Sequence, residues 1–300
     1  MSDAGQNRIS VLRDNRMVPL LPSHAKTGRV QPPVQPWNGI LLERHAVTPM
    51  EIPEHEHKDF CLHLQMTGQE GMEWWSNGHN GVERTAPGSM ILLPAGTKDR
   101  LLWHGPSERL ILSMNPELMA KIAEEAGGVA PEFEEMWSLR DASLERLLSE
   151  MGREMAEGWP LGRLYADLVA AGLASLLLRR HAADPVDLGQ VRGGLPMPQL
   201  RRVMEYVTAN LDRDLRLEEI AQEVSLSPFH FAREFRALTG QSPYQYLLDQ
   251  RMDRAKSLLK NSAWTVQEVA QMTGFHSSVN FVRSFRQRLG VTPGAWRRDA

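Results

Sequence analysis

Two sets of residues in this chain have types and spacings that could do chemistry. Arg233 and Arg283 lie 50 positions apart in similar stretches of sequence, and a guanidinium can donate two hydrogen bonds to one guanine base. His55 and His57 are two positions apart, so on a strand both imidazoles face one side and could bind one metal ion. The first set indicates nucleic-acid recognition, and the second indicates a metal site or a polar pocket.

The arginines belong to an internal repeat. Residues 217–243 and 266–293 share ten aligned identities or near-identities, at an offset of 49 positions that becomes 50 after a one-residue insertion. In each copy a short helix precedes a turn at Ser225 or Gly274, and Ser227 or Ser277 then caps a second helix. Two helices joined by a tight turn and written twice predict a duplicated helix-turn-helix.

The second helix of each copy has two distinct faces. Phe231, Phe235 and Leu238 recur at helical spacing and predict a core face, which 281, 285 and 289 repeat. An arginine on a single helix is more often just a solvent-exposed surface residue. Two matched helices that each carry an arginine favour DNA binding, with contacts to base edges and phosphates. The residues we expect at DNA are Ser227, Phe229, His230, Ala232, Arg233, Arg236, Ser277, Ser278, Val279, Asn280, Arg283 and Arg286.

A long predicted helix at 243–260 joins the two copies. At roughly 1.5 Å per residue it is about 27 Å long. It could hold the two second helices about one DNA turn apart, roughly 34 Å, so that one domain enters two successive major grooves.

Charge is unevenly distributed along the chain. The net charge is -3, from 34 basic and 37 acidic residues, which excludes a basic nucleic-acid coat protein. Residues 197–300 hold 15 basic and 11 acidic residues, a net +4, whereas residues 1–196 hold 19 and 26, a net -7. This asymmetry indicates a basic module that contacts a polyanion and an acidic module with another task.

Other classes are excluded by composition. Cys61 is the single cysteine, so neither an intrachain disulfide nor a thiolate zinc cluster is expected. The first twenty residues lack an apolar segment, and no run approaches 18 apolar residues, so we expect no signal peptide, no membrane span and a cytoplasmic location.

The pattern predicts an α+β protein of two domains. Apolar or alternating runs at 40–47, 60–67, 71–77, 89–94 and 109–114 predict strands of a sandwich or barrel. The apolar segment 161–181 predicts a helix buried either against a second subunit or in the core of its own chain. The expected divisions are a mobile arm at 1–36 with one strand near Val30, a barrel at 37–116, a helical element at 117–181, a linker at 182–198 and the double helix-turn-helix at 199–298.

Residues 199–298 resemble the DNA-binding domain of AraC/XylS-type transcription regulators. The front half resembles that family's sensor, a cupin-like β-barrel followed by a helical dimerisation element. It carries the second cupin motif from Gly88 through Pro94 to Gly96, and a partial first motif of His55, His57 and Gly68. The resemblance implies that base contacts come from outward positions of the two second helices, namely Phe229, Ala232, Arg233, Ser278, Val279 and Arg283.

The cupin resemblance also bears on metal binding. A metal-binding cupin would have a glutamate where Cys61 and Leu62 stand and a histidine where Asp99 stands. Unless Cys61 or His104 substitutes, we expect no metal, no cofactor and a barrel that keeps only a pocket. The candidate liners of this effector pocket are His55, His57, His63, Trp74, Trp75 and Trp103, with His79 as a further possibility.

The sequence thus predicts a sequence-specific transcription regulator without catalytic residues. Its expected partners are double-stranded DNA, a small-molecule effector, a second copy in a homodimer and, for an activator, RNA polymerase. Two alternatives stay open: a cupin-type metalloenzyme, an oxygenase or isomerase, with a regulatory DNA-binding tail, and a DNA-binding regulator that has no effector.

Overall fold

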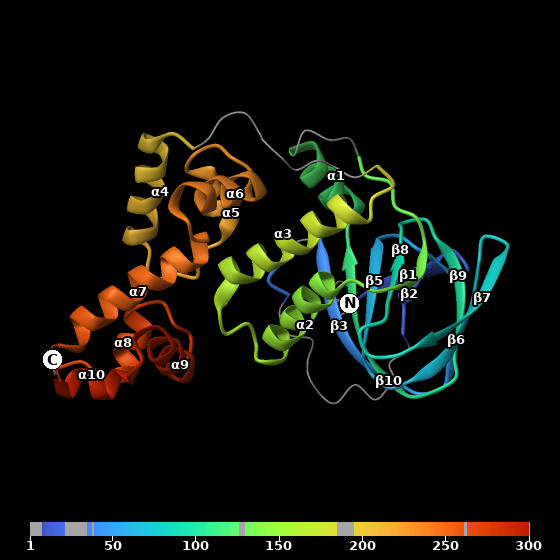
Figure 1. Cartoon of the computed structure of the whole chain (residues 1–300), viewed down its shortest axis with the longest axis horizontal. Coiled ribbons are helices and arrows are strands. Elements are labelled where there is room, and N and C mark those ends of the chain that lie inside the picture. The colour runs from blue at the N-terminus through green and yellow to red at the C-terminus, as the bar shows by residue number, and fades with distance from the viewer. Residues whose placement is uncertain are drawn as a thin grey trace. The chain divides into compact units, whose positions relative to one another are not determined.

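The structure, a computed structural model, describes residues 8–21, 35–37, 39–125, 130–184, 195–260 and 263–299. The chain forms two compact units, residues 1–156 with 172–189, and residues 157–171 with 190–300. The first unit holds the strands and the second the carboxyl-terminal helices, as the colouring of Figure 1 shows. The expected α+β class with two domains is confirmed.

The first unit contains two antiparallel sheets. One has the order β2-β1-β4-β9-β6-β7 and the other β11-β8-β5-β10-β3. The strands are β1 (Ser10–Arg13), β2 (Arg16–Pro19), β3 (Ile40–Val47), β4 (Met50–His57), β5 (Phe60–Thr67), β6 (Glu70–Ser76), β7 (His79–Thr85), β8 (Met90–Leu93), β9 (Lys98–Trp103), β10 (Ser107–Met114) and β11 (Met136–Leu139). Among the described strands no hydrogen-bonded pair joins the two sheets, so the expected sandwich or cupin-like barrel takes the form of two sheets and is not closed.

Apolar side chains from both sheets meet in one core. Ile52, Trp103, Ile91 and Ile111 are almost fully buried in it. The five predicted strands are confirmed as β3, β5, β6, β8 and β10. Within the helical element expected at 117–181, residues 136–139 pair with β8 as an edge strand, and the helix that follows begins at Ala142.

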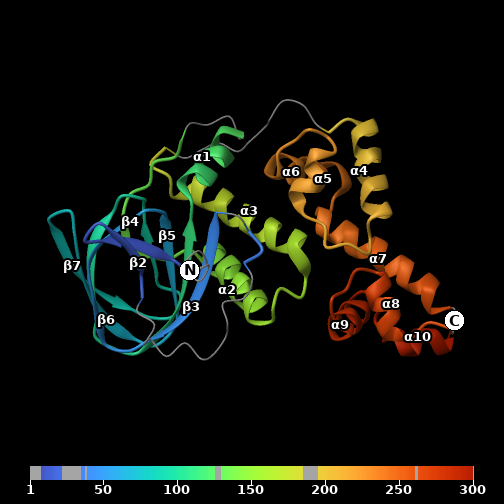
Figure 2. The same ribbon diagram turned by 180° about the vertical axis from the view of Figure 1, so that it is seen from behind.

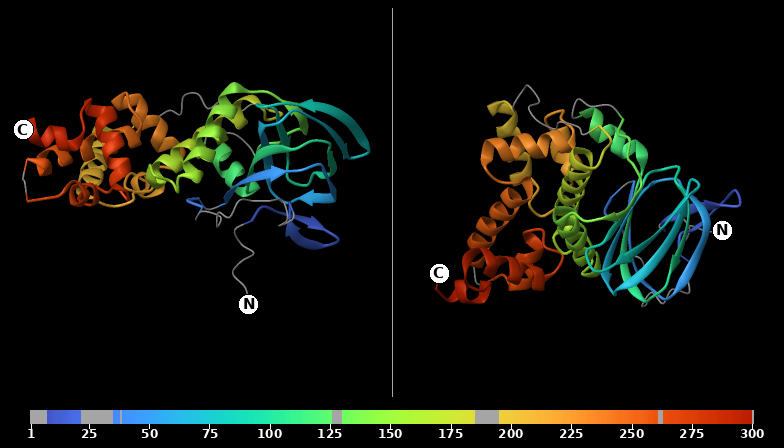
Figure 3. Two further views of the ribbon diagram at one scale, coloured as in Figure 1. Left: turned by 90° about the horizontal axis from the view of Figure 1, so that it is seen from below. Right: turned by 45° about the vertical axis from the view of Figure 1, so that its right-hand side comes forward.

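Part of the predicted arm forms a hairpin. Strands β1 and β2 pair around Asp14 and Asn15, which both have positive φ, a geometry that asparagine and aspartate tolerate in tight hairpin turns. Val11 is fully buried opposite His57 of β4. Residues 8–21 of the arm therefore extend a sheet (dark blue in Figure 3), and the strand predicted near Val30 lies outside the described residues.

Three helices follow the strands, α1 (Pro116–Glu125), α2 (Ala142–Ala156) and α3 (Gly162–Arg180). Every residue of α3 before Arg179 is buried or half-buried within the chain. This burial supports the core alternative for α3, and the subunit interface stays a prediction. The boundary between the compact units falls within α3, and residues 157–171 group with the carboxyl-terminal helices. The helical element at 117–181 stays a prediction.

The second unit holds the remaining helices. They are α4 (Met197–Ala209), α5 (Leu217–Gln222), α6 (Pro228–Thr239), α7 (Pro243–Leu259), α8 (Val266–Met272), α9 (Ser278–Leu289) and α10 (Pro293–Asp299). One core surrounds Phe231 and Phe235, and another surrounds Phe281 and Phe285. Helix α7 runs between these two halves (Figures 1 and 2). Among the described residues, no helix is both long and apolar enough for a membrane span.

Candidate nucleic-acid interface

Helices α8 and α9 form the second copy of the repeat. The Thr265 hydroxyl accepts from the backbone N–H of Glu268, and the Glu268 carboxylate accepts from the Thr265 N–H at 2.7 Å, so α8 begins with a complete capping box. That backbone hydrogen bond lowers the pKa of Glu268. Gly274 turns the chain at a φ of 75°, and the Ser277 hydroxyl accepts from the Val279 N–H at 3.2 Å at the start of α9.

Helices α5 and α6 form the first copy. The Ser227 hydroxyl caps α6 by accepting from the His230 N–H at 3.2 Å, and Ser225 occupies the turn at a φ of 54°. Helix α5 has Arg216 at its N-cap, without a side-chain cap from that residue. Its first N–H, that of Leu217, instead donates to the Asp167 carboxylate of α3 at 3.1 Å. The two copies therefore share a plan but begin differently.

The predicted core faces are confirmed for the aromatic residues. Phe231, Phe235, Phe281 and Phe285 are each at most 1% exposed. Leu238 is 47% exposed, so its assignment to the core is wrong. It lies in the last turn of α6, beyond the apolar residues that pack around Phe235.

The expected DNA-contacting residues differ in exposure between the copies. In the second copy Ser278, Val279, Arg283 and Arg286 are exposed, while Ser277 and Asn280 are half-buried. In the first copy only Arg236 is exposed, and the half-buried residues are Ser227, Phe229, His230, Ala232 and Arg233. The second copy thus presents the more accessible outward face.

Ion pairs hold both candidate base-reading arginines. Arg233 contacts the neighbouring Glu234 at 2.9 Å, with 27% of its side chain exposed. Arg283 lies 3.5 Å from the carboxylate of Glu157, and 51% of its side chain is exposed. Neither arginine is sealed inside the protein, so both guanidinium groups could exchange these carboxylates for DNA.

A buried arginine that we did not predict joins the loop before the first copy to the second copy. Arg251 of α7 donates to the backbone carbonyls of Leu211, at 2.9 Å, and Arg213, at 2.7 Å. Its guanidinium also lies 5.6 Å from the ring centre of Phe275 in the second copy. Burial lowers the pKa of Arg251. An arginine within a helix pattern reads as a solvated residue, so no local signal in the sequence marks this contact.

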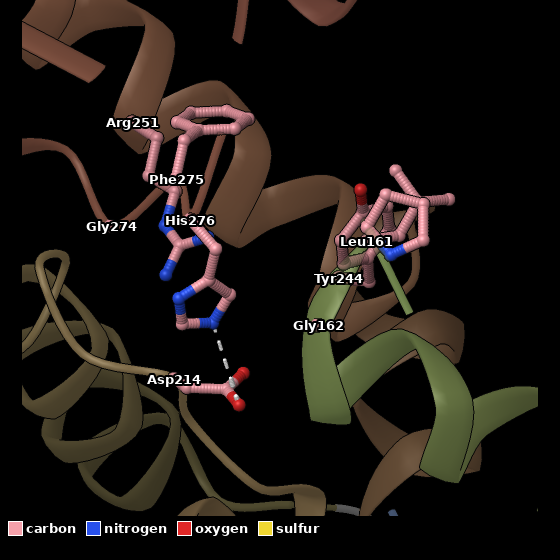
Figure 4. A pocket seen from close by; sticks show the side chains of 9 residues that line it. Leu161, Gly162, Asp214, Tyr244, Arg251, Gly274, Phe275 and His276 are labelled. Carbon is pink, nitrogen blue, oxygen red and sulfur yellow. Dashed lines mark ion pairs between the residues drawn. The ribbon is translucent and has the colours of Figure 1, made fainter. Parts of the chain in front are cut away.

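A crevice lies beside Arg251 (Figure 4). Its walls include Leu161, Gly162 and Tyr244 on one side and Phe275 and His276 on the other. The His276 imidazole lies 3.7 Å from the Asp214 carboxylate at its mouth. Because the Arg251 guanidinium is held by backbone carbonyls, we assign the crevice a packing role.

The expected effector-pocket residues are only partly brought together. His55, His57, His63 and Trp103 are buried in the first unit, and burial lowers the pKa of His55 and, further, that of His63. Trp74 packs against the same core, with its ring stacked 4.6 Å from that of Trp137. Trp75 follows it on β6 and so faces the other side of the strand, with Arg100 4.5 Å from its ring centre.

Asp99 stands where the cupin pattern would have a metal-binding histidine. Asp99 of β9 is 1% exposed, and its carboxylate lies 2.9 Å from His57. The two substitutes that the sequence offered, Cys61 and His104, behave differently. Cys61 is buried, and burial raises the pKa of its thiol well above the usual value. The His104 imidazole lies 2.8 Å from Glu73 in a more exposed ion pair.

Two family models match the chain. One is described as an AraC-like ligand binding domain and covers residues 41–178, and the other is described as a helix-turn-helix domain and covers residues 220–299. The matched ranges correspond to most of the described sheets with α1 to α3, and to the helices from α5 onward.

Several named proteins are similar to parts of the chain. The regulatory protein PocR of Salmonella typhimurium is 36% identical over 34% of this chain and 33% of its own length. The transcriptional activator RhaR of Pectobacterium carotovorum is 26% identical over 86% of this chain and 89% of its own length. The crystallised DNA-binding domain of AdpA, in complex with a target DNA, is 37% identical over 34% of this chain and 91% of that chain, with a TM-score of 0.33. The chain thus spans only about a third of PocR, and 40% of the MmsAB operon regulatory protein of Pseudomonas aeruginosa.

Proposed function

Because the chain belongs to the AraC family, with a matching ligand-binding domain and a matching helix-turn-helix domain, we propose that it is a sequence-specific DNA-binding transcription regulator. Its second unit reads DNA, and its first unit binds a small-molecule effector. The relatives are named as regulators, and this favours a regulator over a cupin-type enzyme with a DNA-binding tail.

The duplicated helix-turn-helix carries the proposal. Both second helices start at a serine cap, so their first N–H groups can approach phosphates. Arg283 projects from the exposed face of α9, where it can donate twice to a guanine. Val279, which is 72% exposed, can contact a thymine methyl group. An apolar side chain this exposed in the first turn of a helix is accounted for by such a contact.

Helix α7 supports the placement of two reading helices on one duplex. It is 17 residues long, which corresponds to about 26 Å of helix. It packs against both helix pairs. Its Arg251 contacts the loop before α5 and Phe275 in the turn before α9. We infer that α6 and α9 enter successive major grooves on one side of the DNA.

The test is selection of DNA from a random pool by the full chain, followed by binding titrations on the selected site. We expect Arg283→Ala to weaken binding to that site and to relax the preference at one base pair, with little effect on unrelated DNA. Arg84→Ala, on β7 of the first unit, is the matched control. Affinity should fall steeply with salt because phosphate contacts release counterions. Equal affinity of Arg283→Ala and the parent for the selected site would contradict the assignment of α9 as a helix that contacts bases.

The effector, the homodimer and RNA polymerase are further parts of the proposal. A thermal-shift screen with a metabolite panel separates an effector-binding regulator from one without an effector, because a ligand specific for the folded state raises stability. Sedimentation velocity tests the homodimer. As a regulator of transcription the protein would act in the cytoplasm, where bacterial DNA and RNA polymerase are found.

A further inference from the structure

Three ionisable side chains meet inside the first unit. His55 and His57 lie on β4, and Asp99 lies on β9, directly opposite His55 in the strand register. All three are at most 3% exposed. Each offers one ligand atom, and these three atoms lie within 4.8 Å of one another. The sheet therefore places two imidazoles and a carboxylate on one face, away from water.

Their polar atoms lack hydrogen bonds. Both carboxylate oxygens of Asp99 and the Nε2 atoms of His55 and His57 are buried without a hydrogen-bond partner among the described residues. This holds even though His57 Nε2 lies 2.9 Å from Asp99 Oδ1, because the approach does not have hydrogen-bond geometry. A buried carboxylate without a donor is costly, and a cation between these atoms would satisfy all four at once.

The orientation of His55 indicates which atom could bind the cation. Its Nδ1–H donates to the backbone carbonyl of Pro53 at 3.0 Å. Since a carbonyl only accepts, the proton of a neutral ring is on Nδ1 and the lone pair is on Nε2, which faces Asp99 at 3.8 Å. Histidines that bind metals commonly donate their second ring N–H to a backbone carbonyl or a carboxylate.

The distances suit a small divalent ion. Nitrogen and oxygen ligands lie about 2.0–2.2 Å from zinc, so two ligands of one tetrahedral ion are about 3.3–3.6 Å apart. The separations of 2.9 Å and 3.8 Å from Asp99 Oδ1 fall on either side of this range. The two imidazole nitrogens lie within 4.8 Å of each other, so the side chains must draw slightly closer around the ion.

The facing sheet adds a further buried histidine. His63 of β5 is fully buried, and neither of its ring nitrogens has a hydrogen-bond partner among the described residues. An imidazole with two unsatisfied nitrogens in an apolar core is as unusual as the Asp99 carboxylate. Among the described residues the group of ligand atoms within 4.8 Å consists of His55, His57 and Asp99, so His63 is an unsatisfied polar group of the same interior and is not counted as a ligand.

We propose that His55, His57 and Asp99 bind one divalent first-row transition-metal ion in the interior of the first unit. Asp99 is then itself a metal ligand. Its place in the cupin pattern, where a histidine would stand, had led us to expect no metal binding. Two imidazoles and one carboxylate suit zinc, manganese, iron(II) or cobalt(II). The site does not depend on the DNA-reading function.

The experiment uses the full chain, freed of metal by chelation and dialysis. Cobalt(II) is titrated and followed by its visible absorption, and zinc is titrated by calorimetry. We expect one ion per chain, and at least a tenfold weaker affinity in His57→Gln and Asp99→Asn. His79→Ala removes an exposed histidine of β7 in the same sheet and should bind metal as the parent does.

Two results would overturn the site. The first is a parent protein that binds no cobalt or zinc at one ion per chain, a result that needs no variant to fold. The second is metal binding that persists unchanged in both His57→Gln and Asp99→Asn while their circular dichroism matches that of the parent. Selected-site DNA binding is measured in parallel, so a failure of the metal site and a failure of the DNA-reading unit are told apart.

Discussion

The two helix-turn-helix copies have the same plan but different supports. The second copy is self-contained, because Thr265 and Glu268 cap α8 within the repeat. The first copy borrows from outside the repeat: Asp167 of α3 accepts the first N–H of α5, and Leu164 packs into the core around Phe231. Two similar sequences therefore fold alike while one of them depends on a helix 50 residues away.

The outward faces differ in the same direction. Val279 and Arg283 of α9 are exposed, whereas Phe229 and Arg233 of α6 are half-buried. Ala232 packs against the same core as Leu164 and Leu168 of α3. The copy that supports itself is thus also the one whose reading face is open. The following variants test this contrast, starting with the largest expected effect.

The turn glycine should be the most sensitive position. A side chain at Gly274 would be strained at its φ of +75° and would place a Cβ 2.3 Å from the carbonyl oxygen of Leu211. We expect Gly274→Ala to cost about 3 kcal/mol or more of unfolding free energy. Ser225→Ala, at the aligned turn, should change it by less than about 0.5 kcal/mol, because Ser225 is exposed and already has a side chain at positive φ. Urea denaturation measures both, and similar costs would contradict the contrast.

The arginines should differ in DNA binding. On the selected site, Arg283→Ala should cost about 1–3 kcal/mol, and Arg233→Ala should cost less because Arg233 must first leave Glu234. Glu234→Gln should release Arg233 and raise affinity severalfold. Fluorescence anisotropy with labelled DNA measures all three. If Arg233→Ala weakens DNA binding more than Arg283→Ala does, the ion pair with Glu234 does not keep Arg233 from contacting the DNA bases.

The local cap of the second copy should make a moderate contribution. Thr265→Ala removes the hydroxyl that accepts from Glu268, and we expect a loss of about 1 kcal/mol. Thr265→Ser keeps the hydroxyl and serves as the control, with a stability close to that of the parent. An unaltered urea midpoint in Thr265→Ala would show that α8 does not need its own cap.

The cap that Asp167 supplies should have an effect that depends on pH and is absent in acid. Burial raises the pKa of Asp167 from 3.8 to about 6. The folded protein then holds this proton more tightly than the unfolded chain does, so stability falls as pH rises from about 4 to 6. Asp167→Asn keeps an oxygen for the Leu217 N–H without the buried charge. Its melting temperature should equal that of the parent below pH 4 and exceed it above pH 6. A variant that is less stable than the parent at pH 7 would contradict this.

Much of the second unit was predictable because its signals are local. Capping residues, turn glycines and the phenylalanine spacing all lie within one repeat, and each was found where expected. The contact between Asp167 and Leu217 and the hydrogen bonds of Arg251 were not predictable, since they join residues 38 to 50 positions apart. No periodic pattern records such pairs.

The first unit was harder to predict for a different reason. Strands β4, β7 and β9 carry charged residues at their exposed positions, and the inward residues of β4 include His55 and His57 beside Ile52. Such strands do not show an apolar alternation. The proposed role of Asp99 was also missed. In the sequence Asp99 only departs from the cupin motif, whereas in the structure its carboxylate lies beside His55 and His57.

Arg251 has a consequence for the DNA that this protein could accept. One side chain holds the loop before α5 and contacts the turn before α9, so the two halves cannot slide or swivel independently without breaking its bonds. One extra base pair between the half-sites would rotate one of them by roughly 35° about the duplex axis. Binding sites should therefore keep a fixed helical phase between half-sites, even where the bases themselves vary.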